Sequence, residues 1–177
     1  MEASLAALGD FARRSEFPAL CYGCSMQSAV GILAVLGLLV ACEPKPTQAP
    51  PEPEIVKAPA GAVQDIVRDA LLDAKKDQRR VVVYVGASWC EPCQVFLDGV
   101  AAGNLPPSLG NLRLLKFDND VDDARLKAAN FGGQMIPRFV KPAADGTGST
   151  RRFEGSVKGP AAMDNIVPRL EALLGEP

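Results

Sequence analysis

The segment Ser88-Trp89-Cys90-Glu91-Pro92-Cys93 constrains the fold of this chain more than any other. A run rich in β-branched residues, 81–85, precedes it, and a pattern typical of a helix follows it. A helix that starts between the two cysteines places Cys90 at its N-terminal end, where free N–H groups and partial positive charge favour an anion. The thiolate, which is the form that attacks disulfides, is therefore favoured at Cys90. Cys93 lies one turn further on, within reach of the first sulfur, and Pro92 suits a first helical turn.

Composition excludes several other kinds of site. The chain has 177 residues, a formal net charge of −2 and no histidine. Without histidine there are no Cys–His pairs, no Ser–His–Asp triads and no His-ligated zinc or copper. The near-neutral charge gives no basic surface, so we expect no nucleic-acid partner. Of the five cysteines, only one close pair lies in the part expected to fold, so we do not expect a disulfide scaffold. We also expect no metal site. The expected redox group is the Cys90–Cys93 disulfide itself, with no other cofactor.

Residues 1–41 are interpreted as a leader or signal segment. The apolar run 29–41 is shorter than the roughly 20 residues of a membrane span, but it fits the apolar core of a secretory signal. It ends in Leu39-Val40-Ala41-Cys42, which resembles the lipobox of bacterial lipoproteins. The resemblance implies that Cys42 is acylated and becomes the first residue after cleavage. It places the folded part on the periplasmic side of the bacterial envelope, anchored in a lipid bilayer. An uncleaved helical anchor with an incidental cysteine is the alternative.

The leader carries three further features to which we assign no chemistry. Cys21-Tyr22-Gly23-Cys24 repeats the Cys-x-x-Cys spacing, but no strand pattern precedes it and no helix pattern follows it. Arg13-Arg14 matches a twin-arginine export signal poorly, because Glu16 follows closely and the apolar run is distant. Met26 is an alternative start of the chain.

Residues 42–61 hold the lipid-attachment cysteine and a proline-rich stretch. Prolines at this density lack N–H donors and fix φ, so no regular element is expected from 43 to about 60. An extended spacer rises about 3.1 Å per residue and would reach roughly 50 Å. We interpret the segment as a tether that holds a domain near a membrane, with a disordered tail as the alternative.

From residue 62 to 177 the pattern alternates between helix and strand, which predicts a single α/β domain. The expected elements are a helix from 62 to about 76, a strand at 81–85, a helix from Cys93 to near Gly103, strands at 112–117, 135–140 and 150–153, a short helix at 122–130, and a final helix opening at Gly159-Pro160. Pro168 is expected to bend or interrupt that last helix.

This order of elements resembles the thioredoxin-like fold, a three-layer α/β/α sandwich with a mixed central sheet. The matching residues are 89–93, Ile136-Pro137 and Phe153-Glu154-Gly155. The resemblance implies that Pro137 is cis and lies against the active-site cysteines, that Ile136 offers backbone hydrogen bonds to a bound peptide, and that Trp89 is a partly exposed platform. A cis bond is tolerable before proline, where it costs only about 0.5–1 kcal/mol.

The sequence departs from thioredoxins at two positions that tune the cysteines. Tyr84 stands where thioredoxins carry an aspartate that handles the proton of the second cysteine, while Lys116 matches the lysine that accompanies it. The alternative for Lys116 is a strand-end lysine in solvent. Glu91 replaces a glycine, and its charge opposes a thiolate beside it. Arg138 is expected at the surface, the alternative being that it turns toward the site and offsets Glu91.

The hypothesis is a disulfide exchange enzyme in which Cys90 attacks and Cys93 resolves the mixed disulfide. A helix dipole contributes about 0.3–1 kcal/mol, which is less than one pKa unit, so we expect a modestly lowered pKa at Cys90 and a reducing couple. The partners would be disulfide-bearing exported proteins and a membrane electron donor. The alternatives are a Cu(I)-binding module, since thiolates are suitable ligands, and a non-catalytic adaptor whose pair stays oxidised.

Overall fold

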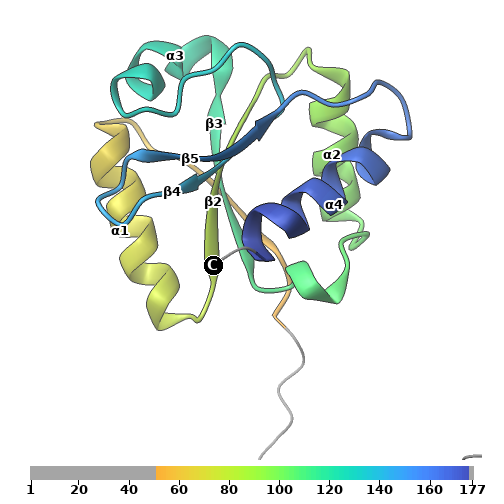
Figure 1. Cartoon of the computed structure of the whole chain (residues 1–177), viewed down its shortest axis with the longest axis horizontal. Helices are drawn as coiled ribbons and strands as arrows, with labels where there is room; N and C mark the ends of the chain where they lie inside the picture. The colour runs from red at the N-terminus through yellow and green to blue at the C-terminus, as the bar shows by residue number, and fades with distance from the viewer. Residues whose placement is uncertain (1–50, 176–177) are drawn as a thin grey trace, which may run out of the picture. The chain divides into compact units, whose positions relative to one another are not determined.

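A computed structural model describes residues 51–175, which form a five-stranded sheet and four α-helices (Figure 1). The elements in chain order are β1 (Glu54–Lys57), α1 (Val63–Lys76), β2 (Arg80–Gly86), α2 (Glu91–Ala101), a 3₁₀ turn (Pro107–Leu109), β3 (Leu112–Asp118), α3 (Asn119–Ala128), β4 (Arg138–Pro142), β5 (Gly148–Glu154) and α4 (Ala162–Gly175). In the described part of the chain, no helix combines the length and the apolar character that crossing a bilayer requires.

The sheet is mixed, with strand order β1-β3-β2-β4-β5. The strands β1, β3 and β2 run parallel, whereas β4 pairs antiparallel with both β2 and β5. Strand β2 is the centre of the sheet, and every residue from Val81 to Gly86 is buried. An unbroken apolar run is the pattern expected of a strand covered on both faces.

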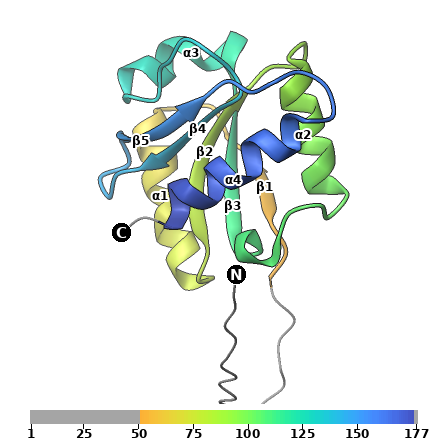
Figure 2. The ribbon, with the colours of Figure 1, turned by 45° about the vertical axis from the view of Figure 1, so that its right-hand side comes forward.

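Helices cover both faces of the sheet, which gives three layers (Figures 1 and 2). On one face, α2 and α4 pack over Tyr84, Leu114 and Phe139. On the other, α1 and α3 pack over Val83, Phe117 and their neighbours. The layer order confirms the predicted fold class, a thioredoxin-like α/β/α sandwich with a mixed sheet.

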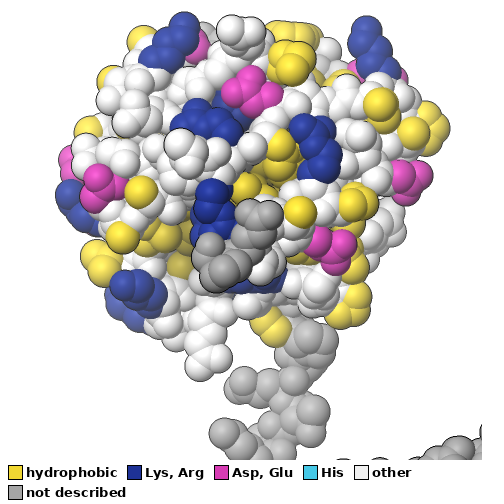
Figure 3. All heavy atoms as spheres, viewed as in Figure 1, with side chains coloured by type: hydrophobic (Ala, Val, Ile, Leu, Met, Phe, Trp, Pro, Cys, Tyr) yellow, Lys and Arg dark blue, Asp and Glu magenta, His cyan; other side chains and the backbone are white. Residues whose placement is uncertain are grey.

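Basic and acidic side chains are interspersed on the face shown in Figure 3.

Four aromatic rings pack between α2 and the sheet. The ring centroid of Phe139 on β4 lies 5.2 Å from that of Tyr84, 5.0 Å from that of Phe96 on α2 and 4.6 Å from that of Phe153 on β5. Aromatic pairs at such separations contribute about 0.5–1.5 kcal/mol beyond their burial. This cluster fixes where α2 starts relative to the end of β2.

Strand β1 corrects the expectation of a segment without regular structure up to residue 60. Glu54–Lys57 pair in parallel with β3, and the Ala58 N–H continues the ladder by donating to the Lys116 carbonyl at 2.9 Å. Pro53 and Pro59 flank the strand instead of interrupting it. Because β1 is an edge strand, only one side of its backbone needs partners, which is the position where nearby prolines are tolerated. Residues 42–50 lie outside the described part.

The carboxyl-terminal half differs from the expectations in two ways. Helix α4 is not interrupted at Pro168, so of the two expected effects of this proline only a bend stays a prediction. Strand β4 begins at Arg138, so residues 135–137, expected at the start of a strand, form a loop. The conformation of that loop is described below.

Candidate active site

The two cysteines share the opening turn of α2. Cys90 is the N-cap residue with extended backbone angles, φ −83° and ψ 102°, and α2 begins at Glu91. The Gln94 N–H donates to the Cys90 carbonyl at 3.1 Å, which starts the helical hydrogen-bond ladder. Cys90 and Cys93 are joined by a disulfide with their Cα atoms 5.2 Å apart. The sequence spacing therefore predicted this local geometry correctly.

Both cysteines are buried and belong to the core cluster under α2, with Cys90 4% and Cys93 1% exposed, but their sequence neighbours differ in exposure. Cys90 is flanked by the exposed side chains of Trp89 and Glu91, whereas Cys93 follows the buried Pro92. A partner that approaches from solvent therefore meets Cys90 first.

Trp89 stands at the surface and is held by α3. Its side chain is 66% exposed, and its indole N–H donates to Asp120 Oδ2 at 2.7 Å. Asp120 is in the first turn of α3, whose N-cap Asp118 accepts from the Asp120 N–H at 2.9 Å. The indole is thus both accessible and oriented, as a docking platform requires.

Glu91 contacts the loop between β5 and α4. Its Oε1 accepts a hydrogen bond from the Gly159 N–H at 3.2 Å. Gly159 has φ +76°, a left-handed conformation that glycine adopts without strain. The carboxylate therefore ties the first turn of α2 to a loop far along the chain.

Arg138 is neither at the surface nor paired with Glu91, so both interpretations of this residue are corrected. Its side chain is 1% exposed and its Nε lies 3.5 Å from Glu154 Oε1. Burial lowers the pKa of the Arg138 guanidinium, and attraction to Glu154 opposes that shift. An arginine next to an active-site proline is buried here because an acidic partner on the neighbouring strand faces it.

The Ile136–Pro137 bond is cis, as the resemblance implied. Pro137 is buried, and its carbonyl accepts from the Gly155 N–H at 2.8 Å. Ile136 is half-buried and packs against both core clusters. Within residues 51–175, neither the N–H nor the C=O of Ile136 has a hydrogen-bond partner. These two groups are available to an extended peptide, which binds through such backbone contacts.

Tyr84 lies behind the second cysteine. Its hydroxyl donates to the Cys93 carbonyl at 3.4 Å, and burial raises the pKa of Tyr84. A small cavity of about 270 Å³ adjoins it, lined also by Ser88, Gln94, Lys116 and other residues of β2, α2 and β3. Lys116 is half-buried and is the register partner of Tyr84 on β3. The structure thus places Lys116 beside the tyrosine in the wall of this cavity.

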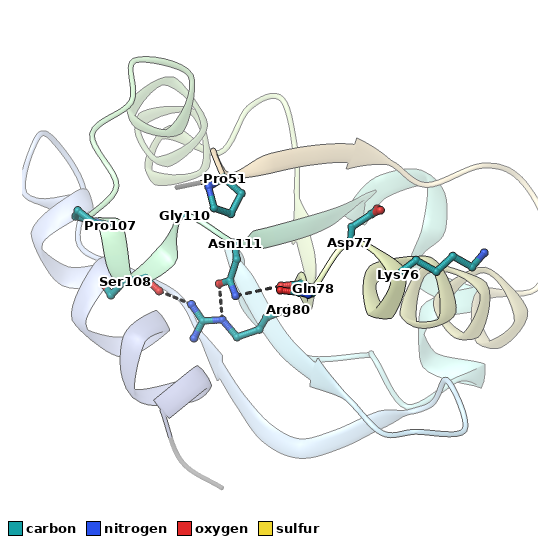
Figure 4. A pocket seen from close by; sticks show the side chains of 9 residues that line it. All are labelled: Pro51, Lys76, Asp77, Gln78, Arg80, Pro107, Ser108, Gly110 and Asn111. Carbon is teal, nitrogen blue, oxygen red and sulfur yellow. Dashed lines mark hydrogen bonds between the residues drawn. The ribbon is translucent and has the colours of Figure 1, made fainter. Parts of the chain in front are cut away.

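A hollow of about 980 Å³ lies at the opposite end of the strands (Figure 4). There the Asn111 side chain accepts from Arg80 Nε at 2.7 Å and donates to the Gln78 carbonyl at 3.3 Å. Arg80 also donates to the Ser108 carbonyl. These polar groups are occupied in joining two turns of the chain, so we interpret the hollow as structural. The chemistry lies at the other end, where β2 runs into α2.

Sequence reasoning missed three contributors to the site and named others that remain predictions. The missed residues are Asp120, Gly159 and Glu154; only the Phe153-Glu154-Gly155 match indicated one of them, and without a role. The predicted lipidation site Cys42 and the Cys21/Cys24 pair lie outside the described residues.

The sequence matches no protein-family model and no curated protein sequence. It is similar to several solved structures. Trxlp from Edwardsiella tarda EIB202 has 20% identity and a TM-score of 0.41, over 64% of this chain and 98% of that one. Oxidised thioredoxin O1 from Arabidopsis thaliana has 16% identity and a TM-score of 0.42, over 70% and 96%. A mutant thioredoxin from Halobacterium salinarum NRC-1 has 24% identity and a TM-score of 0.39, over 68% and 92%.

Proposed function

We propose that this chain is a membrane-tethered thiol–disulfide oxidoreductase that reduces disulfides of exported proteins on the periplasmic side of the envelope. The observation that carries the proposal is the Cys90–Cys93 disulfide at the start of α2, with the exposed residues Trp89 and Glu91 on either side of Cys90. Trp89 and the unpaired backbone of Ile136 supply the docking groups beside it.

The reaction is two successive thiol–disulfide exchanges. The reduced Cys90 thiolate attacks one sulfur of the substrate disulfide, which forms a mixed disulfide and releases one substrate thiolate. The Cys93 thiolate then attacks the Cys90 sulfur, which releases the second substrate thiolate and leaves the Cys90–Cys93 disulfide. Two electrons pass to the substrate, whose thiolates take up two protons. A dithiol donor in the membrane must restore the reduced pair.

A reducing direction follows from the weak stabilisation of the Cys90 thiolate. The N-terminal end of α2 contributes about 0.3–1 kcal/mol. The charge of Glu91 works against it, and the neutral phenol of Tyr84 adds no positive charge. A couple whose dithiol form is only modestly stabilised gives up electrons readily, because strong oxidants in this chemistry depend on a stabilised reduced form.

A tether of this kind would keep the domain close to a donor in the membrane. Lipid attachment at Cys42 would confine the domain near the bilayer and raise its effective concentration toward a membrane donor. Since β1 begins at Glu54, the spacer is shorter than the sequence suggested, and residues 42–53 would span roughly 37 Å when extended.

Insulin reduction by the full chain, driven by dithiothreitol, tests the proposed activity. We expect turnover that Cys90→Ser abolishes and that Ser88→Ala, an exposed neighbour in the same turn, leaves nearly unchanged. Cys93→Ser should trap clients as mixed disulfides in envelope extracts. Absence of turnover in the wild-type chain would eliminate the reductase.

Incorporation of labelled palmitate by intact cells tests the anchor separately. We expect label in the wild-type chain and none in Cys42→Ser, with Cys24→Ser as the matched control. Equal labelling of wild type and Cys42→Ser would contradict the lipid anchor while leaving the redox proposal standing.

A further inference from the structure

An ion pair between the buried Arg138 and the partly exposed Glu154 lies behind the cis-proline loop. Glu154, at the end of β5, is the cross-strand neighbour of Arg138, which follows Pro137. Arg138 Nε lies 3.5 Å from Glu154 Oε1, and Arg138 also donates from Nη1 to the Phe131 carbonyl at 3.1 Å. The side chain of Glu154 is 20% exposed. The pair therefore joins β4, β5 and the start of the loop that leads to Ile136.

The other oxygen of the same carboxylate holds the loop itself. Glu154 Oε2 accepts hydrogen bonds from the backbone N–H groups of Gln134 and Met135, each at 2.9 Å. Hydrogen bonds from N–H groups to an ionised carboxylate are about twice as strong as bonds between neutral groups. Glu154 thus fixes the two peptide units immediately before Ile136.

Gly133 lets the loop approach the pair this closely. A Cβ built at this position would overlap Glu154 Oε1 and Arg138 Nε. Any side chain here would displace the carboxylate or the loop. The glycine, the acid and the arginine therefore act as one unit.

The position of this unit is hard to explain by stability alone. Burying charged groups is expensive, and a buried ion pair often contributes less to stability than apolar residues of the same size. What the pair does secure is one conformation of a loop whose next residue, Ile136, has an unpaired backbone and packs against the core cluster that contains both cysteines. The exposed side chain of Met135 extends the same surface.

We propose that Glu154, oriented by Arg138, is a positioning residue that holds the Gln134–Ile136 backbone in the form that binds an extended polypeptide, so that it favours the reduction of polypeptide disulfides and has little effect on small disulfides. This inference rests on the proposed function. An extended peptide binds through main-chain hydrogen bonds, so it needs the loop fixed in place. A small disulfide needs only access to Cys90.

Kinetics of the full chain with two substrates test the inference. The variants are Glu154→Gln, which removes the charge at constant size, and Gly133→Ala, which displaces the carboxylate. The control is Glu54→Gln, since Glu54 also pairs with two arginines, Arg79 and Arg113, at the far edge of the sheet. For insulin we expect KM to rise at least about tenfold in both variants, the effect of losing charge-assisted hydrogen bonds. For hydroxyethyl disulfide we expect kcat/KM within about twofold of wild type, and the control should change neither.

Amide hydrogen exchange of the same proteins gives a readout that does not depend on activity. We expect the N–H groups of Gln134 and Met135 to exchange at least about tenfold faster in Glu154→Gln, while the amides of β2 keep their protection. A folded Glu154→Gln with unchanged insulin kinetics, or an equal loss for both substrates, would overturn the inference. If the wild-type chain reduces neither substrate, the proposed function fails, and the exchange rates still decide whether Glu154 fixes the loop.

Discussion

The hydroxyl of Tyr84 donates a hydrogen bond to the carbonyl oxygen of Cys93 across 3.4 Å. The contact links the centre of the sheet to the first turn of α2 through a neutral group. A carboxylate at position 84 would bring a charge or a titrating proton under the second cysteine. The phenol brings neither near neutral pH, so it serves as a support for the turn and as part of the aromatic cluster with Phe96 and Phe139.

The burial of Tyr84 should make the stability of the fold depend on pH in the alkaline range. Tyrosine in an unfolded chain titrates near pH 10, and burial raises the pKa of Tyr84 in the folded protein. The folded state therefore keeps a proton that the unfolded state loses, so this stability is complete below about pH 10 and is lost as the pH rises through the folded pKa. Near pH 11 the destabilising effect of Tyr84→Phe should therefore be smaller than its effect at neutral pH by roughly 1 kcal/mol, because the wild-type protein loses this stability and the variant has none to lose. Urea unfolding of both proteins at the two pH values measures this, and an equal difference at both would contradict it.

Glu91→Gln should lower the pKa of the reduced Cys90 thiol, but by less than about one unit. The carboxylate is exposed, and unit charges about 4 Å apart in water interact by only about 1 kcal/mol. Thiolate ultraviolet absorbance against pH measures the change in the reduced protein. Asp98→Asn, which removes a charge near the other end of the same helix, should leave the titration unchanged. A decrease in the Cys90 pKa of more than about one unit would mean that Glu91 affects the Cys90–Cys93 redox couple more strongly than we propose.

Asp120→Ala should free the indole of Trp89. The hydrogen bond between them, 2.7 Å long, joins an otherwise exposed ring to α3. Trp89 is the single tryptophan of the chain, so time-resolved fluorescence anisotropy reports on it alone. In Asp120→Ala we expect faster local motion of the Trp89 indole and a KM for insulin several-fold higher than that of the wild type. Asp123→Ala, which breaks the surface pair with Lys127 on the same helix, is the control, and equal anisotropy in both variants would argue against the contact.

A chain that starts at Ala62 should be less stable than one that starts at Pro51. The longer chain keeps β1, its ladder with β3 and the partly buried Val56. Partial burial of such side chains accounts for about 2–3 kcal/mol. The midpoint of urea denaturation should fall accordingly, whereas Glu54→Gln in the longer chain should cost less than about 1 kcal/mol. Equal midpoints for the two chains would show that β1 adds nothing to stability.

The sequence predicts the elements whose periodicity is long or unbroken. The apolar run at 81–85 identifies β2, and apolar residues at three- and four-residue steps identify α1. The Cys-x-x-Cys turn follows from the change of period between β2 and the helix after it, α2. These signals are local, so they need no knowledge of tertiary contacts.

Strand β1 and the Arg138–Glu154 pair were not predictable for the opposite reason. Four residues between two prolines are too few to show a period, and their conformation depends on a partner strand more than fifty residues away. Arg138 sits between apolar neighbours, and its burial depends on the register that sets Glu154 opposite it. Such pairings can be predicted only when the order and register of the strands in the sheet are known.

The direction of β1 decides which way the disulfide faces. Because β1 runs parallel to β2, the polypeptide enters at the end of the sheet where β2 starts, while Cys90 follows the end where β2 stops (Figure 2). If the preceding residues carry the proposed lipid anchor, the point where the tether joins the domain and the disulfide lie at opposite ends of the sheet, so the tether must be long enough for the domain to turn its reactive end toward a donor in the bilayer.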